Sequence, residues 1–358
     1  MADSHNIKSY TLPALTGWLA GHREPAFRAR QIFQWLYQRR AATFEEMSNL
    51  SRSLRGLLSE HFTLGAMTRE EVSRSADGSR KYALRLADGQ RIEAVLMPNN
   101  THHTLCVSTQ VGCAMGCDFC MTARMGLVRN LSAGEIVQQV VEAYGDLGEE
   151  GKIRNVVFMG MGEPLHNYDN LAAALTILTE DYGCGFSRRR LTVSTSGLVP
   201  AIRRFAADKL PANLAISLNG VTDEVRARLM PVNRRWNIAT LLEACREIPK
   251  EPRTRITIEY VLLKGITDSL ADARKLVKLL HGLKCKVNLI PFNPWPDSAY
   301  EGTSLEHARV FQEVLLNKGL LATMRISKGQ DIQAACGQLI TESRSPRKQE
   351  AAGQAAAR

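Results

Sequence analysis

From about residue 105 onward, the chain repeats one pattern: a short apolar run rich in β-branched residues, followed by a longer stretch with apolar residues at helical spacing. The short runs predict strands, and the stretches between them predict helices. Strands are predicted at 105–109, 155–160, 190–196, 213–218, 255–263 and 286–292, with helices that include 170–183, 238–248 and 270–283. This alternation indicates an α/β fold with a parallel, open or barrel-like sheet, whose ligands bind at the carboxyl ends of the strands.

The residues before this repeat follow two other patterns. Apolar residues fall near one helical face over 24–40 and again over 43–62, which predicts a small arginine-rich helical module. On both sides of Asp88-Gly89, apolar and polar residues alternate over 79–98, which predicts a β-hairpin. We therefore expect an N-terminal helical accessory domain at 1–65, a β-hairpin linker at 66–100, the core at 101–342 and a disordered basic tail at 343–358.

The composition excludes some classes of protein and favours others. The chain has 358 residues, of which 44% are apolar, enough for one large domain and a small one. Eight cysteines are too few for a disulfide scaffold, and no secretion signal or membrane-length apolar run is present, so we expect a cytoplasmic protein that spans no membrane. The net charge of +10 suggests a polyanionic partner such as nucleic acid, although a basic but inert surface would give the same value.

Three cysteines stand close together in the loop after the first predicted core strand, at Cys113, Cys117 and Cys120. Cysteine thiolates bind zinc or iron–sulfur clusters. A structural zinc needs four ligands, and His102 or His103 could supply the fourth. The C-x3-C-x2-C spacing does not match the paired knuckles of a zinc ribbon. A [4Fe–4S] cluster held by three cysteines would instead leave one iron open for a substrate.

Polar residues follow the later predicted strands at their carboxyl ends. Glu163 follows Gly160 and Gly162, while Ser194, Ser196, Ser217, Asn219 and Asn293 end three further strands. Each could be a turn or helix cap when considered alone. Because parallel strands end at one rim, we expect these side chains to converge there and to bind a ligand.

Taken together, several strings resemble the RlmN/Cfr family of radical S-adenosylmethionine (SAM) RNA methyltransferases. The resemblance covers about 91–339 and extends more weakly through the N-terminal helices. The strings are the three-cysteine motif with "GLVRNLSAGEI", then "MGMGEPLHN", "RRLTVSTSG", "LAISLNG", "LMPVNRRWNI", "TIEYVLL", "NLIPFNP" and "DIQAACGQL". This resemblance implies a partial (β/α)6 barrel.

The family's site residues carry over to matching positions of this chain. The resemblance implies that Cys113, Cys117 and Cys120 hold a [4Fe–4S] cluster. SAM would contact Gly162, Glu163, Ser194, Ser217, Leu218, Asn219 and Asn293. Asn219 stands where family members often have His, and an Asn can still hydrogen-bond a ligand. The remaining Cys184, Cys245 and Cys285 are expected to be small buried hydrophobic residues.

The resemblance also implies an unusual methyl transfer. Cys336 would be methylated by one SAM, and a 5′-deoxyadenosyl radical from a second SAM would activate that methyl group for addition to adenine. Glu93 would accept the ring proton, and Cys106 would attack Cys336 to release the product and leave a transient disulfide. The implied target is adenine carbon 2 in 23S rRNA and in tRNA, and carbon 8 is the alternative within the family. A non-catalytic zinc-containing RNA-binding protein is the alternative from another class.

The implied partners are RNA and an electron donor of the reductase–flavodoxin type, and we expect a monomer. Some basic residues around the core and in the helical module should contact RNA phosphates. The candidates in the core are Arg188–Arg190, Arg203, Arg204, Arg234, Arg235, Lys284 and Lys286, and those in the module are Arg23, Arg28, Arg30, Arg39, Arg40, Arg52 and Arg55. The target base would have to leave its stack to reach a buried radical.

Overall fold

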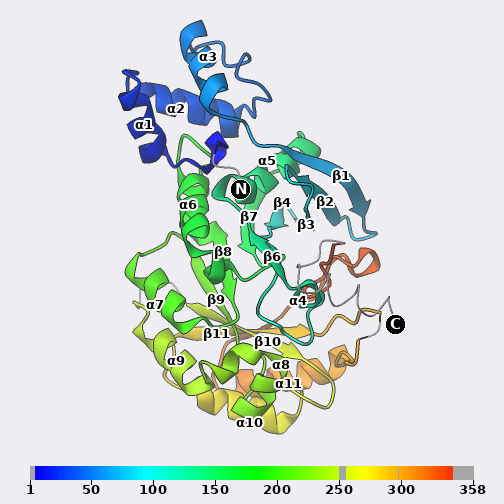
Figure 1. Ribbon diagram of the computed structural model, residues 1–358. Coiled ribbons are helices and arrows are strands. Elements are labelled where there is room, and N and C mark those ends of the chain that lie inside the picture. Colours follow the sequence, from blue (N-terminus) through cyan, green and yellow to red (C-terminus); the bar gives the residue numbers. More distant parts are fainter. Residues whose placement is uncertain (1–4, 250–254, 297, 342–358) are drawn as a thin grey trace, which may run out of the picture.

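The computed structural model describes residues 5–249, 255–296 and 298–341 (Figure 1). Its centre is a ten-stranded mixed sheet in the order β1-β2-β3-β4-β7-β8-β9-β10-β11-β12. Neighbouring strands from β4 to β12 run parallel, as the alternating pattern predicts. These strands are β4 (His102–Cys106), β7 (Ile153–Phe158), β8 (Leu191–Thr195), β9 (Asn213–Ser217), β10 (Ile256–Leu262), β11 (Cys285–Pro291) and β12 (Ala322–Met324).

Six of these parallel strands are the predicted ones, with shifted ends. The first begins at His102 rather than at residue 105, because the polar residues 102–104 pair with β3. The short β12 was not predicted, since three residues are too few for a periodic signal. The predicted α/β barrel-like fold is therefore confirmed.

The helices of the core cover the outer side of the curved sheet (Figure 1). Their buried faces pack on the strands, which leaves the inner side of the arc open. They are α5 (Ala133–Leu147), α6 (Tyr168–Thr179), α7 (Val199–Ala207), α8 (Asp223–Leu229), α9 (Ile238–Glu247), α10 (Leu270–Leu279) and α11 (Leu305–Asn317). The short α4 (Met121–Met125) lies elsewhere, against residues 337–339. Ser132 and Glu135 form a capping box at the start of α5. Across the described residues, every helix is too short or too polar to traverse a lipid bilayer.

The sheet extends into three antiparallel strands: β1 (Met67–Arg74), β2 (Arg80–Leu86) and β3 (Arg91–Asn99). The predicted hairpin is β2–β3, and Gly89 in its turn has a φ of 82°. The sequence reasoning missed β1, whose run of charged residues hides its alternation. Because β3 also pairs with β4, the linker and the core share one sheet.

The N-terminal helical module lies at one end of the molecule (Figure 1). It contains α1 (Leu12–Gly21), α2 (Phe27–Phe33), a π-helical turn at Gln34–Gln38 and α3 (Arg52–His61). The helix predicted over 24–40 is confirmed in most of its length. The one predicted over 43–62 was too long, since Ser51 caps α3 by accepting a hydrogen bond from the Leu54 N–H. The sequence reasoning did not predict α1.

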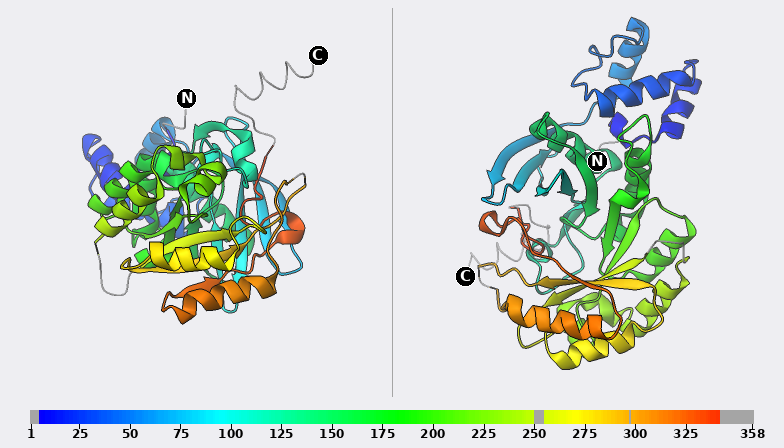
Figure 2. Two further views of the ribbon diagram at one scale, coloured as in Figure 1. Left: turned by 90° about the horizontal axis from the view of Figure 1, so that it is seen from below. Right: turned by 180° about the vertical axis from the view of Figure 1, so that it is seen from behind.

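A C-terminal segment, residues 325–341, crosses the open side of the barrel (Figure 2). It is tied to the antiparallel strands, where Ile340 N–H donates to Glu93 at 2.9 Å and Thr341 donates to the Arg91 carbonyl at 3.2 Å. It is also tied to the loop after β11, where Gln338 donates to the Pro294 carbonyl at 2.7 Å. The disordered tail expected at 343–358 lies outside the described residues.

Candidate active site

The loop that carries the three clustered cysteines is held between two short antiparallel strands, β5 (Gln110–Gly112) and β6 (Leu127–Asn130). Cys113 N–H donates to the Gly126 carbonyl at 3.1 Å. Gly112 has a φ of 73°, and a Cβ on it would lie 1.8 Å from the Gly126 oxygen, so only glycine fits. The start of the loop is therefore fixed by backbone geometry.

The cysteine loop faces a cavity of about 170 Å³ at the carboxyl ends of the parallel strands. The predicted convergence of the strand ends is confirmed, because one cavity collects residues from the cysteine loop, five strand ends and the C-terminal segment. The predicted residues that line it are Cys113, Cys117, Cys120, Gly162, Glu163, Ser194, Ser196, Ser217, Asn219, Asn293 and Cys336. Leu218 is fully buried and lies outside this lining, as does Glu93.

Glu163 is buried at the end of β7 and is already partly satisfied. Its carboxylate accepts hydrogen bonds from the Ser196 N–H at 2.7 Å and the Leu165 N–H at 3.1 Å. Burial raises the pKa of this carboxyl group, and the hydrogen bonds oppose the shift. Each carboxylate oxygen has more than one acceptor site, so Glu163 can still accept a bond from a ligand ammonium.

Two buried polar atoms on residues of the cavity wall have no hydrogen-bond partner among the described residues: Ser196 Oγ and Glu259 Oε1. The other oxygen of Glu259 accepts a bond of 3.0 Å from Ser194. Buried polar atoms are rarely left unsatisfied, so these two indicate a polar ligand. The sequence reasoning missed Glu259, although a lone acidic residue in the apolar run of β10 was a signal that could have found it.

Arg226 is a second residue that the sequence reasoning missed. Its side chain is completely buried on α8, and its guanidinium donates to the carbonyls of Ser196, Ser217 and Leu218 and to Asn233, at 2.6 to 3.1 Å. The carbonyls of two predicted ligand residues are thus bound to one cation. Burial lowers the pKa of Arg226 to about 10, which leaves it charged at neutral pH.

Cys106 and Cys336 line a second, smaller cavity of about 70 Å³. Cys336 and Cys120 line both cavities, so the two lie next to each other with these cysteines between them. The Asn293 amide donates to the Cys336 carbonyl at 3.2 Å and holds this part of the C-terminal segment at the end of β11. Burial raises the pKa of the Cys106 thiol to about 12, while the nearby guanidinium of Arg325 opposes the shift.

Glu93 lies on β3, two residues before Val95, which pairs with Cys106 and lines the smaller cavity. Alternate residues of a strand face the same side, so Glu93 points toward the side of the sheet that holds the two cysteines. Its carboxylate forms an ion pair of 3.0 Å with Lys81. Burial raises the pKa of Glu93, and Lys81 opposes the rise.

The described residues fit a [4Fe–4S] cluster better than a single metal ion. No group of three or more His, Cys, Asp or Glu side chains in the described ranges is arranged to hold one ion. The three thiols nevertheless line a single cavity, as needed when each binds a different iron atom. Burial raises the pKa of all three, so they form stable thiolates only against a cationic partner such as iron. The Ser196 and Glu259 oxygens that lack a hydrogen bond fit the polar groups of SAM.

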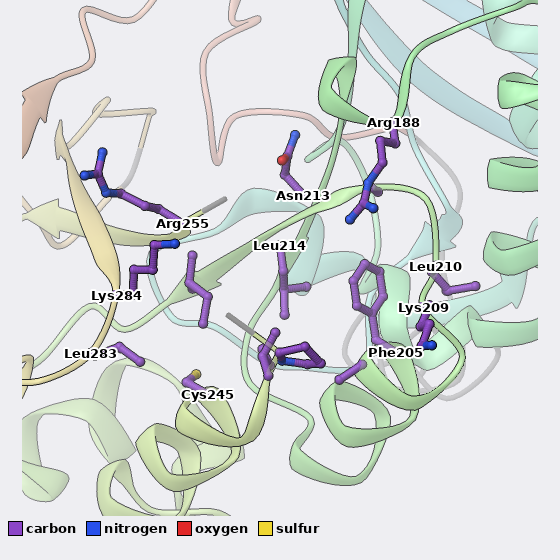
Figure 3. A pocket seen from close by; sticks show the side chains of 15 residues that line it. Arg188, Phe205, Lys209, Leu210, Asn213, Leu214, Cys245, Arg255, Leu283 and Lys284 are labelled. Carbon is purple, nitrogen blue, oxygen red and sulfur yellow. The ribbon is translucent and has the colours of Figure 1, made fainter. Parts of the chain in front are cut away.

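Another cavity, of about 140 Å³, lies at the opposite, amino-terminal ends of the strands (Figure 3). Asn213 and Ile256, the first residues of β9 and β10, line it together with Phe205 and Leu214. Of the residues predicted to contact RNA, Arg188 and Lys284 line this cavity. None of the predicted catalytic, SAM-binding or cluster residues lies there, so this cavity is separate from the candidate active site.

Comparison with known proteins places these features in a family. The model of the radical SAM superfamily matches residues 107–277, and the model described as "Ribosomal RNA large subunit methyltransferase N-terminal domain" matches residues 5–64. Dual-specificity RNA methyltransferase RlmN from Syntrophobacter fumaroxidans is 49% identical, over 94% of this chain and 98% of the relative. RlmN from Syntrophotalea carbinolica is 50% identical, over 93% of this chain and 89% of the relative.

A solved structure agrees with the sequence comparison. The crystal structure of a radical SAM methyltransferase from Sphaerobacter thermophilus matches this fold with a TM-score of 0.89 and 45% sequence identity. The match covers 94% of this chain and 99% of that chain. The similarity therefore includes both the helical module and the barrel.

Proposed function

The chain belongs to the family of the dual-specificity RNA methyltransferase RlmN, within the radical SAM superfamily, and we propose that it methylates carbon 2 of an adenosine in 23S rRNA and in tRNA. One observation carries this proposal: Cys336 lines both the cavity of the three clustered cysteines and the cavity of Cys106. A thiol in this position can receive a group on one side and exchange disulfides on the other. A zinc-containing RNA-binding protein would have no use for that arrangement.

Radical SAM enzymes use a [4Fe–4S] cluster and SAM, and the larger cavity has residues suited to both. In this proposal, Cys113, Cys117 and Cys120 hold the cluster. SAM is bound by Gly162, Glu163, Ser194, Ser217, Asn219 and Asn293, which line the cavity, and by Leu218, which lies between two of them in the chain. When bound, the cluster supplies an electron, and SAM supplies the methyl group and the source of the radical. The C-terminal segment covers the open side of the barrel and limits the access of water.

The chain's own thiols and Glu93 carry the remaining steps of the proposal. The Cys336 sulfur first accepts a methyl group. This methyl group then gives up one hydrogen atom to the radical derived from SAM, and its carbon bonds to the adenine ring. Glu93, whose pKa is raised by burial, takes the proton from the substituted ring carbon. The Cys106 thiolate attacks the Cys336 sulfur and forms a disulfide. The sulfur–carbon bond breaks, and the released carbon keeps the electron pair and takes up a proton to become the new methyl group. Cellular thiols then reduce this disulfide.

The helical module, residues 1–65, is proposed as the RNA-binding accessory part. Its family model carries a ribosomal RNA description, which supports this assignment. Some of its cations have structural roles, since the guanidinium of Arg30 lies 5.2 Å from the ring of Tyr182 and that of Arg40 lies 5.7 Å from the ring of Tyr144. Arg23 and Arg52 are exposed and make no ion pair or side-chain hydrogen bond with a described residue, so they are better candidates for phosphate contacts.

Mass spectrometry of adenosines from rRNA and tRNA tests the function. RNA from cells with the intact gene should contain 2-methyladenosine that is lost on deletion and restored by the plasmid-borne gene. A plasmid encoding Cys336→Ala should not restore it. Loss of 8-methyladenosine instead would assign the carbon-8 reaction, and unchanged adenosines in both RNAs would contradict the proposal.

A further inference from the structure

The inner side of the sheet carries a third hollow, which we call the inner groove. It has a volume of about 440 Å³ and is lined by residues from β3 to β11 and from the C-terminal segment. Thr104, Thr192 and Thr257 give it a polar floor. The groove shares Met159 with both cavities of the candidate active site, and it also shares Arg325 with the cavity of Cys106 and Cys336. It therefore borders the cavity of the two reactive cysteines on the inner side of the sheet.

The inner groove has an excess of positive charge. Lys286, Arg325 and Lys328 line it, against a single carboxylate from Glu259. Arg325 lies 4.0 Å from Glu259, and Lys328 donates to the Pro98 carbonyl, so these two cations already have partners. Lys286 makes no ion pair or side-chain hydrogen bond with any residue in the described ranges. One cation in the groove is thus available to an anionic ligand.

The register of the sheet gives the position of Lys286 relative to the candidate active site. Lys286 pairs with Thr257, while Asn288 pairs with Glu259 in the wall of the SAM cavity. Two residues along a strand correspond to roughly 7 Å. Lys286 therefore lies one layer of side chains below the level of Glu259, on the same inner face and away from the [4Fe–4S] ligands.

An exposed apolar side chain completes the groove. Ile326 lines it and is 72% exposed, the highest value among the large hydrophobic residues in the described ranges. An apolar side chain beside a cation can pack against the flat face of a base while the cation contacts a phosphate. A nucleotide, with its base and phosphate, has this chemistry.

We propose that the inner groove binds the RNA strand next to the target adenosine and that Lys286 contacts a phosphate of that strand. The inference rests on the proposed function, and it adds the route by which the RNA reaches the cysteines. The target base enters the cavity of Cys106 and Cys336, while the neighbouring nucleotide lies over the groove against Ile326. The strand must be unpaired at this point, because the target base has to leave its stack to reach Cys336.

The test compares RNA affinity at several salt concentrations for Lys286→Ala, Lys286→Arg and the wild type. The probe is the rRNA or tRNA fragment that the wild type methylates. Loss of one phosphate contact with a single strand should reduce the magnitude of the negative slope of log K against log salt by about 0.7. This corresponds to about fivefold weaker binding at 0.1 M salt. Lys286→Arg should retain affinity. Lys318→Ala, which removes an exposed charge after α11, is the matched control and should change neither quantity.

Methylation of Cys336 in the absence of RNA, read by mass spectrometry of its peptide, should be unchanged in Lys286→Ala. An unchanged slope and affinity in Lys286→Ala would overturn the inference. It would also be overturned if Lys284→Ala, in the cavity at the opposite strand ends, lowered the slope while Lys286→Ala did not. If the wild type neither binds nor methylates either RNA, the proposed function itself is refuted. If only the result expected for Lys286→Ala is absent, the inference about the groove is refuted and the proposed function is not.

Discussion

Cys106, the last residue of β4, and Cys336, in the C-terminal segment, line one cavity although most of the barrel separates them in the chain. Two ties bring Cys336 there: the bond from the Asn293 amide to its carbonyl and the bond from the Met121 N–H to the Gly337 carbonyl at 2.8 Å. Because Met121 directly follows the cysteine loop, the same segment is anchored to the proposed cluster site. The Cys336 thiol thus lies between the cavity in which it would accept a methyl group and the cavity in which Cys106 would attack it.

The first prediction concerns release by Cys106. In Cys106→Ala, the methyl carbon of Cys336 can join the adenine ring, but no thiol is present to break the resulting bond. A covalent RNA–protein adduct through Cys336 should accumulate, visible as a shifted band on a denaturing gel and as a modified peptide after nuclease digestion. Cys184→Ala, which lies outside both cavities, is the control. Continued turnover without an adduct in Cys106→Ala would show that another group releases the product.

The second prediction concerns the [4Fe–4S] cluster. Protein purified without oxygen should be brown and contain iron and sulfide, and Cys113→Ala, Cys117→Ala and Cys120→Ala should each lose most of both. Cys285→Ala should keep them, since this cysteine lies at the start of β11, far from the strand ends that face the cluster site. Zinc without iron, even after anaerobic reconstitution, would contradict the radical mechanism.

The third prediction concerns Glu93. Glu93→Gln keeps the size of the side chain and its place beside Ile340 but cannot accept a proton. RNA methylation should fall by about 100-fold or more, the usual contribution of a general base. S-methylation of Cys336 should continue, because it requires no ring proton. Glu70→Gln, at an exposed ion pair with Arg91 on the same sheet extension, should leave the rate unchanged. Equal loss of both methylations in Glu93→Gln would point to a structural role.

Patterns that repeat within a short window were predictable from the sequence. The six main parallel strands, the β2–β3 hairpin and the α5 capping box all depend on neighbours within a few residues, so their signals are local. The strand ends could be assigned to one site because parallel topology itself brings them together. The helix α1 also has local signals, in the cap at Thr11 and in Pro13, and it was missed only because its apolar residues cover several faces.

Features that depend on tertiary contacts were not predictable. Arg226 appears in the sequence as an ordinary helical arginine, and only the fold shows that it is fully buried against the carbonyls of two strand ends. The C-terminal segment has little regular structure, so no periodic signal shows that it closes the barrel. The strand β1 gains its stability from pairing with β2 rather than from apolar alternation.

The fourth prediction follows from the burial of Arg226. Arg226→Met has a similar length and no charge, but it leaves the carbonyls of Ser196, Ser217 and Leu218 without their donor. The free energy of unfolding, measured by urea denaturation, should fall by about 3 kcal/mol, and SAM affinity should fall with it. Arg203→Met, at an exposed ion pair with Glu247, should change stability little. Unchanged stability in Arg226→Met would mean that water satisfies these carbonyls.

The last prediction concerns pH and the contact between the helical module and the core. Lys8 is buried, its ammonium donates to Gln138 at 2.6 Å, and burial lowers its pKa from 10.5 to about 8. Between these values the unfolded chain binds more protons than the native state, so the free energy of unfolding gains a contribution that increases with pH. Below about pH 8 the native state must keep a buried charge, and this contribution is lost.

Lys8→Met lacks this titration. The free energy of unfolding of the wild type minus that of Lys8→Met should therefore increase between pH 7 and pH 10, by up to roughly 3 kcal/mol. Urea denaturation at pH 7, 8.5 and 10 measures the difference, in which the other titrating groups cancel. Lys264→Met, at an exposed ion pair with Glu301, should show no such increase. A difference that stays flat or decreases with pH would show that Lys8 is solvated in the native state and that the module does not bury it against α5.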